Sequence, residues 1–226
     1  MEQYSKILKL IENDTLSCIQ EKSVVIVGIG GVGGYALEML CRFGLKKITI
    51  IDADVVDVSN LNRQVIALHS NIGVSKVEIA KKRILDINPS CQVTDICVFL
   101  NANNINDYIP KNVDYIIDCC DTVTTKMELI KYAKKNNIPV ISSMGTGNRL
   151  DATKLMITDI YKTKNDPLAK VMRKLCKENN IKHLDVLVSS ELPIKTHDRT
   201  PGSTPFVPST AGIYIANYIV RKWLQN

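Results

Sequence analysis

Residues 24–52 read VVIVGIGGVGGYALEMLCRFGLKKITIID, and this stretch decides the fold. The apolar, β-branched run at 24–27 is typical of a buried parallel strand. Four glycines follow at once: Gly28, Gly30, Gly31 and Gly33. Apolar residues at helical spacing come next, and a second apolar run at 48–51 ends in Asp52. This order of strand, glycine turn, helix and strand predicts a Rossmann-like nucleotide site.

Each part of this unit has a physical role in holding a nucleotide. Glycine is needed in the turn because a side chain would prevent tight folding and keep the backbone away from a phosphate. The helix behind the turn points free N–H groups, and the positive end of its dipole, at a bound anion. Asp52 stands at the tip of the second strand, where a carboxylate can reach ribose hydroxyls.

Strand and helix patterns alternate along the rest of the chain as far as Gly147, which predicts a parallel sheet covered on both faces. Expected helices span 3–20, 75–86, 101–108, 123–136, 167–179 and 209–224. Expected strands after the first two span 91–98, 115–117, 138–142, 154–161 and 186–189. The N-terminal helix is expected to bury Ile7, Leu10, Ile11 and Leu16.

We therefore predict one α/β domain over residues 1–226, a doubly wound and mostly parallel sheet with antiparallel strands and helices near its C-terminus. The first 20 residues are its N-terminal helix. Residues 191–208 contain four of the eight prolines and are predicted to form a mobile crossover loop.

Composition limits the class of protein. Hydrophobic residues make up 45% of the chain and charged residues 23%, which is ordinary for a globular domain. Charged residues interrupt every apolar run before it could span a bilayer, and the mixed-charge N-terminus is no secretory signal, so we expect a cytoplasmic protein. The seven cysteines form no C-x-x-C pair, which argues against a disulfide framework or a zinc ribbon. The net charge of +6 suits either an RNA partner or a merely lysine-rich surface.

The identity of the nucleotide depends on residues beyond the glycine turn. NAD is the first alternative, since the turn and Asp52 suit a dinucleotide. Residues 60–64 (NLNRQ) and Lys76 instead bring amides and two cations to the strand tips, as a polyphosphate requires. Asp118 and Asp121 follow the fourth strand, where carboxylates can hold Mg²⁺. Together these groups favour ATP, although solvated charges and helix caps remain simpler explanations of the same residues.

These motifs resemble the adenylating domain of ubiquitin-activating-type enzymes, the bacterial ThiF/HesA/MoeB family. The residues that carry the resemblance are GIGGVG at 28–33, IDAD at 51–54, NLNRQ at 60–64, Lys76 and DCCD at 118–121. Within the family, three later segments resemble the tRNA threonylcarbamoyladenosine dehydratases: ITD with KT at 157–163, DPLA at 166–169 and GSTPFVPSTAG at 202–212. Those enzymes use ATP to activate the carboxylate of a threonylcarbamoyl group on a tRNA adenosine, and the loss of water gives a cyclic product.

The resemblance implies a role for each motif residue. It implies that ATP is bound by Gly28, Gly30, Gly31, Gly33, Asp52, Asp54, Asn60, Arg63, Gln64 and Lys76. Gly30 and Gly31 would approach the phosphates, and Asp52 would hold the ribose. The implied catalytic residues are Arg63, Lys76 and Asp121, with Asp121 holding Mg²⁺ and Asp118 supporting it.

The resemblance also implies a homodimer, and the chain departs from the family pattern at a few positions. Lys6 and Lys9 stand where the family carries arginine in the N-terminal helix, and Thr122 replaces a common asparagine. The zinc-binding C-x-x-C pairs of the sulfur-carrier activators are absent, which disfavours that branch. Whether a sulfur-relay protein is a further partner stays open, and a buried helix thiol is a simpler explanation of Cys176 than an acceptor role.

Two other functions remain on the sequence alone. One is adenylation of the C-terminal carboxylate of a ubiquitin-like sulfur-carrier protein or peptide, and the other is a non-catalytic nucleotide-binding module. For the favoured tRNA substrate, a set of basic residues is equally well explained as phosphate contacts or as solvated charges. That set is Arg173, Lys174, Lys177, Lys195 and Arg199.

Overall fold

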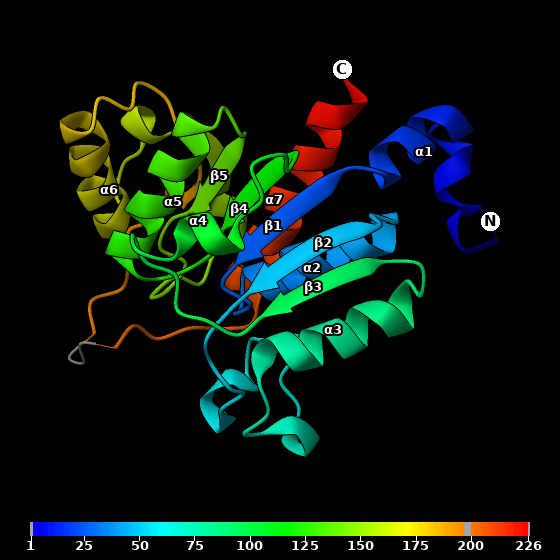
Figure 1. The fold of residues 1–226 in the computed structure, drawn as a ribbon. Helices are drawn as coiled ribbons and strands as arrows, with labels where there is room; N and C mark the ends of the chain where they lie inside the picture. The colour runs from blue at the N-terminus through cyan, green and yellow to red at the C-terminus, as the bar shows by residue number, and fades with distance from the viewer. Residues whose placement is uncertain (1, 197–199, 226) are drawn as a thin grey trace.

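A single seven-stranded sheet organises the computed structural model, which describes residues 2–196 and 200–225 (Figure 1). The strands are β1 (Ser23–Val27), β2 (Lys47–Ile51), β3 (Gln92–Ile96), β4 (Tyr115–Asp118), β5 (Val140–Ser143), β6 (Leu155–Asp159) and β7 (Asp185–Ser189). They lie in the order β3-β2-β1-β4-β5-β7-β6. All neighbours are parallel except β6, which runs antiparallel to β7. The predicted doubly wound α/β fold with a C-terminal antiparallel pair is confirmed.

Two layers of helices cover the sheet. The helices are α1 (Asn13–Gln20), α2 (Gly33–Phe43), α3 (Lys76–Ile87), α4 (Ile105–Tyr108), α5 (Val123–Lys135), α6 (Pro167–Glu178) and α7 (Phe206–Leu224). Residues of α2, α3 and α7 form one core cluster with the strands, and residues of α4, α5 and α6 form another. Successive strand residues alternate between the clusters, as Val24 and Val25 do, because a pleated strand points its side chains to opposite faces.

The chain reverses its winding between β1 and β4, which are hydrogen-bonded neighbours in the sheet. From β1 the sheet continues through β2 to β3 on one side, and from β4 through β5 on the other. At such a switch point the loops after the two strands diverge and leave a crevice at the carboxyl ends of the strands. The glycine turn after β1 and the residues after β4 therefore meet at one place.

The N-terminal region differs from its prediction. In place of one helix over 3–20, two single turns of 3₁₀ helix (Glu2–Tyr4 and Ile7–Lys9) precede α1. Leu10 was expected to be buried but is 88% exposed, whereas Leu16 is buried. The helix begins at Asn13-Asp14, residues that favour helix starts over helix interiors because their side chains compete for backbone hydrogen bonds.

The C-terminal helix also begins earlier than predicted. Residues 206–208 were assigned to the crossover loop but form the first turn of α7, where Pro208 is tolerated because its missing N–H would have no helical partner. The mobility of the loop stays a prediction. Asn148 binds the described part of this loop at Gly202. The backbone N–H of Asn148 donates to Gly202 O (2.8 Å), and Asn148 Oδ1 accepts from Gly202 N (2.6 Å).

In the part of the chain that the structure describes, no helix combines the length and apolarity that a membrane crossing needs.

The contact between α2 and α7 leaves no room for a side chain at Gly212. A Cβ atom there would lie 2.2 Å from Val32 O and 2.8 Å from Ala36 N, both backbone atoms. Gly212→Ala must therefore separate the helices, and we expect the free energy of unfolding to fall by about 1–3 kcal/mol. Urea denaturation measures this loss.

Gly202→Ala is the matched control, because a Cβ there would lie 3.5 Å from Asn148 Oδ1, an ordinary contact. Equal stability of the Gly212→Ala variant and the unaltered protein would contradict the close helix packing.

Candidate active site

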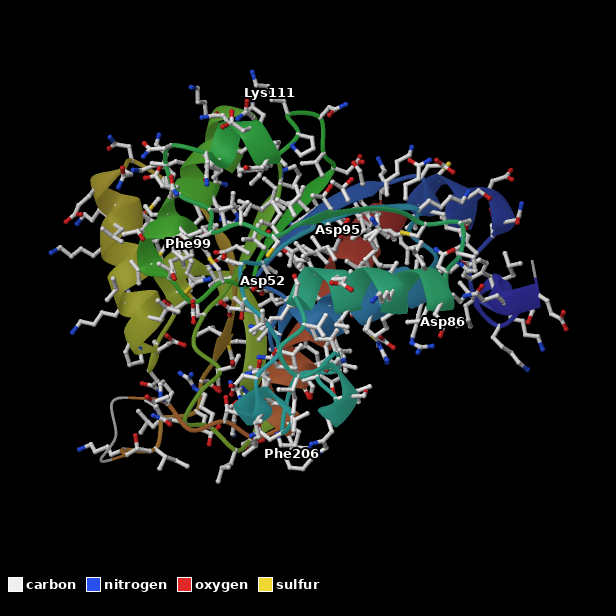
Figure 2. All side chains as sticks on the ribbon, turned by 60° about the horizontal axis from the view of Figure 1, so that its bottom comes forward. Asp52, Asp86, Asp95, Phe99, Lys111 and Phe206 are labelled. Carbon is white, nitrogen blue, oxygen red and sulfur yellow. The ribbon has the colours of Figure 1, made fainter. Side chains whose placement is uncertain are left out.

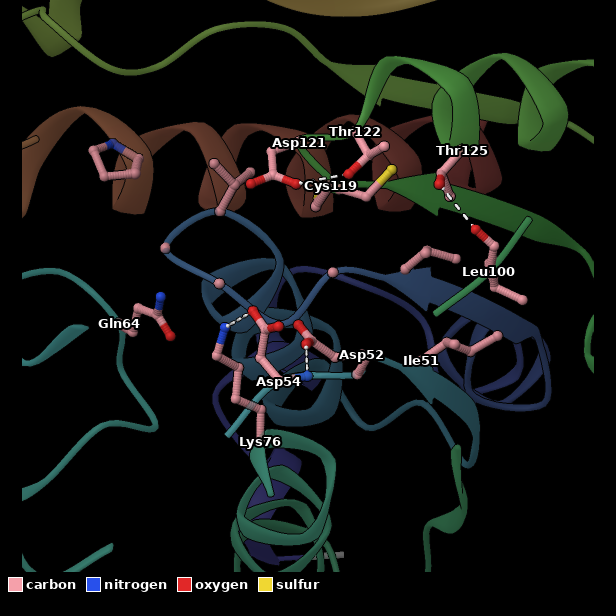
Figure 3. A pocket seen from close by; sticks show the side chains of 18 of the residues that line it. Ile51, Asp52, Asp54, Gln64, Lys76, Leu100, Cys119, Asp121, Thr122 and Thr125 are labelled. Carbon is pink, nitrogen blue, oxygen red and sulfur yellow. Dashed lines mark hydrogen bonds and ion pairs between the residues drawn. The ribbon is translucent and has the colours of Figure 1, made fainter. Parts of the chain in front are cut away.

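The largest concentration of predicted site residues lines one cavity of about 270 Å³ at the switch point of the sheet. Figure 3 looks into it, with Asp121 and Thr122 on one side and Asp52 and Asp54 opposite. Of the predicted nucleotide and metal ligands, ten lie in or close to its wall: Gly28, Gly30, Gly31, Gly33, Asp52, Asp54, Arg63, Gln64, Lys76 and Asp121. Asn60 and Asp118 do not line it.

The glycines divide into two kinds. Gly28 has a φ of +88°, and a Cβ on it would lie 2.7–2.8 Å from the backbone of Cys119 and Cys120. A Cβ on Gly33 would lie 1.9 Å from Gly28 O, so Gly33 shapes the turn and is not itself among the lining residues. Gly30 and Gly31 line the cavity, and a Cβ on Gly30 would meet only the Gln64 side chain, at 3.8 Å. The turn thus presents bare backbone to a ligand, as a phosphate requires.

Asp52 ties the glycine turn to the end of β2. One carboxylate oxygen accepts from Ile29 N (2.6 Å) and the other from Asp54 N (2.9 Å). Each oxygen can still accept a second hydrogen bond, because a carboxylate has about four acceptor sites. The fixed carboxylate is thus available to ribose hydroxyls at the cavity wall.

A cation stands close to Asp52. Lys76 Nζ lies 2.7 Å from Asp54 Oδ2, with the Lys76 side chain 7% exposed and that of Asp54 70% exposed. The ammonium group is therefore fixed inside the wall while its counter-ion faces solvent. A phosphate oxygen entering the cavity would find a positioned cation that needs no reorganisation.

The NLNRQ segment contributes two of its predicted ligands to the cavity. The Gln64 side chain is buried in the wall, and its Oε1 has no hydrogen-bond partner among the described residues, which leaves an acceptor ready for a ligand. Arg63 lines the cavity with its guanidinium steadied by Ser59 O at 2.6 Å and Asn62 Oδ1 at 2.9 Å. Asn60 instead accepts from Asp57 N through Oδ1, at 3.1 Å, and caps the turn before Arg63.

The two aspartates after β4 have different surroundings. Asp121 is exposed on the cavity wall, and Thr122 Oγ1 donates to its Oδ1 at 3.3 Å. Asp118 is fully buried, and its Oδ2 is held by Lys126 Nζ (3.0 Å) and Ser142 Oγ (2.5 Å). The predicted supporting role of Asp118 at a metal does not fit this position, because its carboxylate is buried and already forms an ion pair with Lys126. Asp121 is the carboxylate that faces the cavity.

Burial governs the thiols beside this turn. It raises the pKa of Cys119 to about 12, and it raises the pKa of Cys120, whose thiol also donates to Asp118 Oδ1 (3.0 Å). Both thiols are therefore protonated at neutral pH and are poor nucleophiles. Cys176 is fully buried in α6 with a pKa raised to about 11 by burial, so it packs and is not placed as an acceptor.

Sequence reasoning missed several residues of the site and its supports. Phe99, 57% exposed, and Thr125, Thr146 and Ser203 line the cavity. Lys126 lies in the helix expected over 123–136, yet it is fully buried, and although burial lowers its pKa, Asp118 raises the pKa overall. A lysine one helical turn after Thr122, on the apolar face of α5, was the available signal.

A second buried ion pair supports the part of the cavity wall that contains Thr146. Arg149 Nη2 lies 3.1 Å from Asp166 Oδ2, and both side chains are almost wholly buried. The same guanidinium donates to Gly145 O, and Gly145 N donates to Asp166 at 3.1 Å. These bonds fix the loop that carries Thr146 into the cavity wall.

Comparison with known proteins agrees with this geometry. A model of the ThiF family matches residues 4–225. The chain belongs to the ThiF family. A relative from Bacillus subtilis named tRNA threonylcarbamoyladenosine dehydratase is 37% identical over 244 aligned residues, which cover 100% of this chain and 96% of the relative.

Comparison with solved structures gives the same result. A crystal structure of the Escherichia coli tRNA N6-threonylcarbamoyladenosine dehydratase TcdA in complex with ATP is 33% identical, with a TM-score of 0.93 over 99% of this chain and 94% of that one. A complex of the same protein with AMP matches equally well. E. coli MccB, at 18% identity and a TM-score of 0.72, shares the fold alone.

The Asp118–Lys126 pair yields a stability prediction. Lys126→Met leaves a buried carboxylate without its counter-ion, and we expect the free energy of unfolding to fall by about 3–5 kcal/mol. The double variant Asp118→Asn/Lys126→Met removes both charges and should regain most of that loss. Lys131→Met is the control, because Lys131 pairs with Glu128 at 2.9 Å while 42% exposed, and it should change stability by less than about 1 kcal/mol.

Equal effects of Lys126→Met and Lys131→Met in urea denaturation would contradict the buried pair. So would a double variant that is no more stable than Lys126→Met.

Proposed function

We propose that this ThiF-family protein is an ATP-dependent tRNA threonylcarbamoyladenosine dehydratase. The observation that carries the proposal is the full-length similarity to proteins of that name, combined with a cavity that presents phosphate-binding groups at the switch point. ATP fits that cavity, because it offers bare glycine backbone, an anchored carboxylate, a fixed lysine and an unpaired Gln64 oxygen.

In the first step, a carboxylate oxygen of the threonylcarbamoyl group attacks the α-phosphorus of ATP and pyrophosphate leaves. The backbone at Gly30 and Gly31 and the cations of Arg63 and Lys76 bind the phosphates and oppose the charge that grows on the leaving group. Asp52 fixes the ribose and so aligns the α-phosphorus for in-line attack. Positioning and electrostatics therefore supply most of the catalysis.

Mg²⁺ fits beside Asp121. Its carboxylate is exposed on the wall, and among the described residues no group of three His, Cys, Asp or Glu side chains gathers as a metal cage. An ion there would take its other ligands from phosphates and water, as Mg²⁺ commonly does. When bound, it would neutralise phosphate charge and favour the departure of pyrophosphate.

In the second step the substrate's own carbamoyl group attacks the activated carbonyl carbon, and AMP leaves with one of the former carboxylate oxygens. The overall change in the nucleoside is the loss of one water. No protein nucleophile is required, which agrees with the protonated thiols of Cys119 and Cys120.

The proposal includes a cytoplasmic homodimer, in which Lys6 and Lys9 stand where the family carries arginine and supply positive charge without the bidentate fork of a guanidinium. Both side chains are exposed and available to a second subunit. A sulfur-relay protein is not required by this chemistry. Light scattering on the purified protein gives the mass that tests the dimer.

The function is tested with purified protein, Mg-ATP and tRNA bearing threonylcarbamoyladenosine, followed by mass spectrometry of the nucleosides. We expect ATP-dependent loss of one water from that nucleoside. Pyrophosphate exchange without this loss would overturn the tRNA substrate and favour a peptide or ubiquitin-like carboxylate. Absence of both reactions would overturn the enzymatic function and favour a nucleotide-binding module.

Asp121→Asn tests the metal role within this function. The amide keeps the size of the side chain but removes its charge, so we expect kcat to fall by about 10²-fold and the Mg²⁺ concentration for half-maximal rate to rise. Asp107→Asn, on the exposed face of α4, is the matched control and should keep both values. Unchanged Mg²⁺ dependence in Asp121→Asn would remove Asp121 from the metal site.

A further inference from the structure

Positive charge is concentrated in one part of the chain. Residues 131–182 hold 12 of the 29 Lys and Arg residues but 4 of the 23 Asp and Glu residues. Their net charge is therefore +8, and the remainder of the chain carries −2, which together give the overall +6. The excess charge belongs to the segment that runs from the end of α5 to just past α6, and not to the chain as a whole.

The unpaired lysines of this segment lie on two neighbouring helices and on the chain just before and after the second of them. Helices α5 and α6 lie side by side at one end of the molecule (Figure 1), and both contribute to the same core cluster. Lys134 of α5 is near enough to α6 to act electrostatically on the buried Cys176. Several long side chains with nitrogen tips project into solvent from this end (Figure 2). We call this surface the α5–α6 lysine face; its exposed members are Lys134, Lys135, Lys162, Lys164, Lys170, Lys177 and Lys182.

The charges on this face are not neutralised by the protein. Within the described residues, none of the seven lysines has a carboxylate within ion-pair distance. Some exposed lysines elsewhere are paired, as Lys47 is with Glu21 (3.2 Å) and Lys82 with Glu78 (2.6 Å), whereas others, such as Lys111, have no carboxylate of the described residues within that distance. Asp166, the acid nearest the start of α6, is buried against Arg149.

The structure also separates contact residues from structural ones. Arg173 is half-buried, and its Nη1 donates to Thr163 O and Oγ1, both at 2.7 Å, so it holds the loop before α6. Lys174 lies 3.8 Å from Glu178, a weak pair that reduces its charge. Of the three basic residues of α6 that the sequence suggested for phosphate contact, Lys177 alone has no partner among the described residues. The other two suggested residues lie beyond α6: Lys195 is on the exposed crossover segment, and Arg199 is outside the described residues.

We propose that the α5–α6 lysine face binds the phosphate backbone of the RNA substrate, an inference that rests on the proposed function. Lysine ammonium groups are flexible point charges that suit contact with phosphates in any sequence. The face has little apolar surface for a membrane, since Val171, at 45% exposure, is the one large apolar residue of α6 that is exposed. Phosphate contact is therefore the chemistry that the face supports best.

The face is connected to the cavity at one end. Asp166 caps α6 by accepting from Ala169 N (2.8 Å), and it also binds Gly145 N and Arg149 of the loop that carries Thr146 into the cavity wall. Helix α6 then extends for about 18 Å, at about 1.5 Å per residue. An RNA lying along the lysines can therefore place one modified nucleoside at the cavity while its phosphates remain on the helices.

The test compares two triple variants that change the charge equally. Lys164→Glu/Lys170→Glu/Lys182→Glu alters the face, and Lys82→Glu/Lys111→Glu/Arg221→Glu alters exposed positions elsewhere. The affinity of each for tRNA bearing threonylcarbamoyladenosine is measured over a range of salt concentrations. The face variant should bind at least about tenfold more weakly, with a log-log salt slope lowered by about two, because phosphate contacts release counterions. The control should lose less than about threefold, and both should keep the ATP KM of the unaltered protein.

Equal losses in the two triple variants would show a general charge effect and overturn the proposal, as would unchanged tRNA affinity in the face variant. Binding to phosphatidylserine vesicles that the face variant alone loses, with tRNA affinity intact, would assign the face to a membrane instead. If the face variant binds tRNA normally and dehydrates it, the proposal that the face binds RNA is wrong and the proposed function stands. If the unaltered protein binds tRNA through the face but causes no ATP-dependent loss of water, the function is wrong and the face stands.

Discussion

A buried ion pair at the carboxyl end of β4 is the constraint on which the site depends. Lys126 and Asp118 are both wholly removed from solvent, and Ser142 of β5 donates to the same carboxylate oxygen. Burial of two charges is costly unless each is well paired, so the pair fixes where α5 begins relative to β4 and β5. Cys119 and Cys120 lie in the turn between them, and Asp121 follows at the cavity wall.

The glycine turn after β1 packs directly against the Cys119–Cys120 turn after β4, so the position of the first depends on the position of the second. Gly28 approaches the Cys119–Cys120 backbone so closely that no side chain fits between them. The phosphate-binding backbone after β1 and the carboxylate after β4 are thus held by direct contact. Arg149 and Asp166 hold the remaining wall through a second buried pair. Rigid supports of this kind keep the groups that meet ATP in place before it binds.

Much of this arrangement could be predicted from the sequence because it depends on short-range patterns. The strands, the glycine turn and the ends of the strands could be predicted, and so the residues that gather at one edge of the sheet could be named. The burial of Asp118 in an ion pair could not be predicted, since its partner Lys126 lies eight residues away and resembles any other lysine of a polar helix. The position of Asn60 outside the cavity wall could not be predicted either, because its role in capping a turn depends on local backbone geometry. Leu10 shows the converse limit, as an apolar residue at helical spacing in a segment that does not form one helix.

The central claim is that the carboxylate of the substrate is activated by transfer of AMP from ATP. It is tested most directly with tRNA whose threonylcarbamoyl carboxylate is labelled with ¹⁸O, followed by mass spectrometry of the released nucleotides. Our account predicts AMP that carries one labelled oxygen and pyrophosphate that carries none, since the carbon–oxygen bond breaks when the ring closes. Unlabelled AMP, or label in ADP or inorganic phosphate, would contradict it.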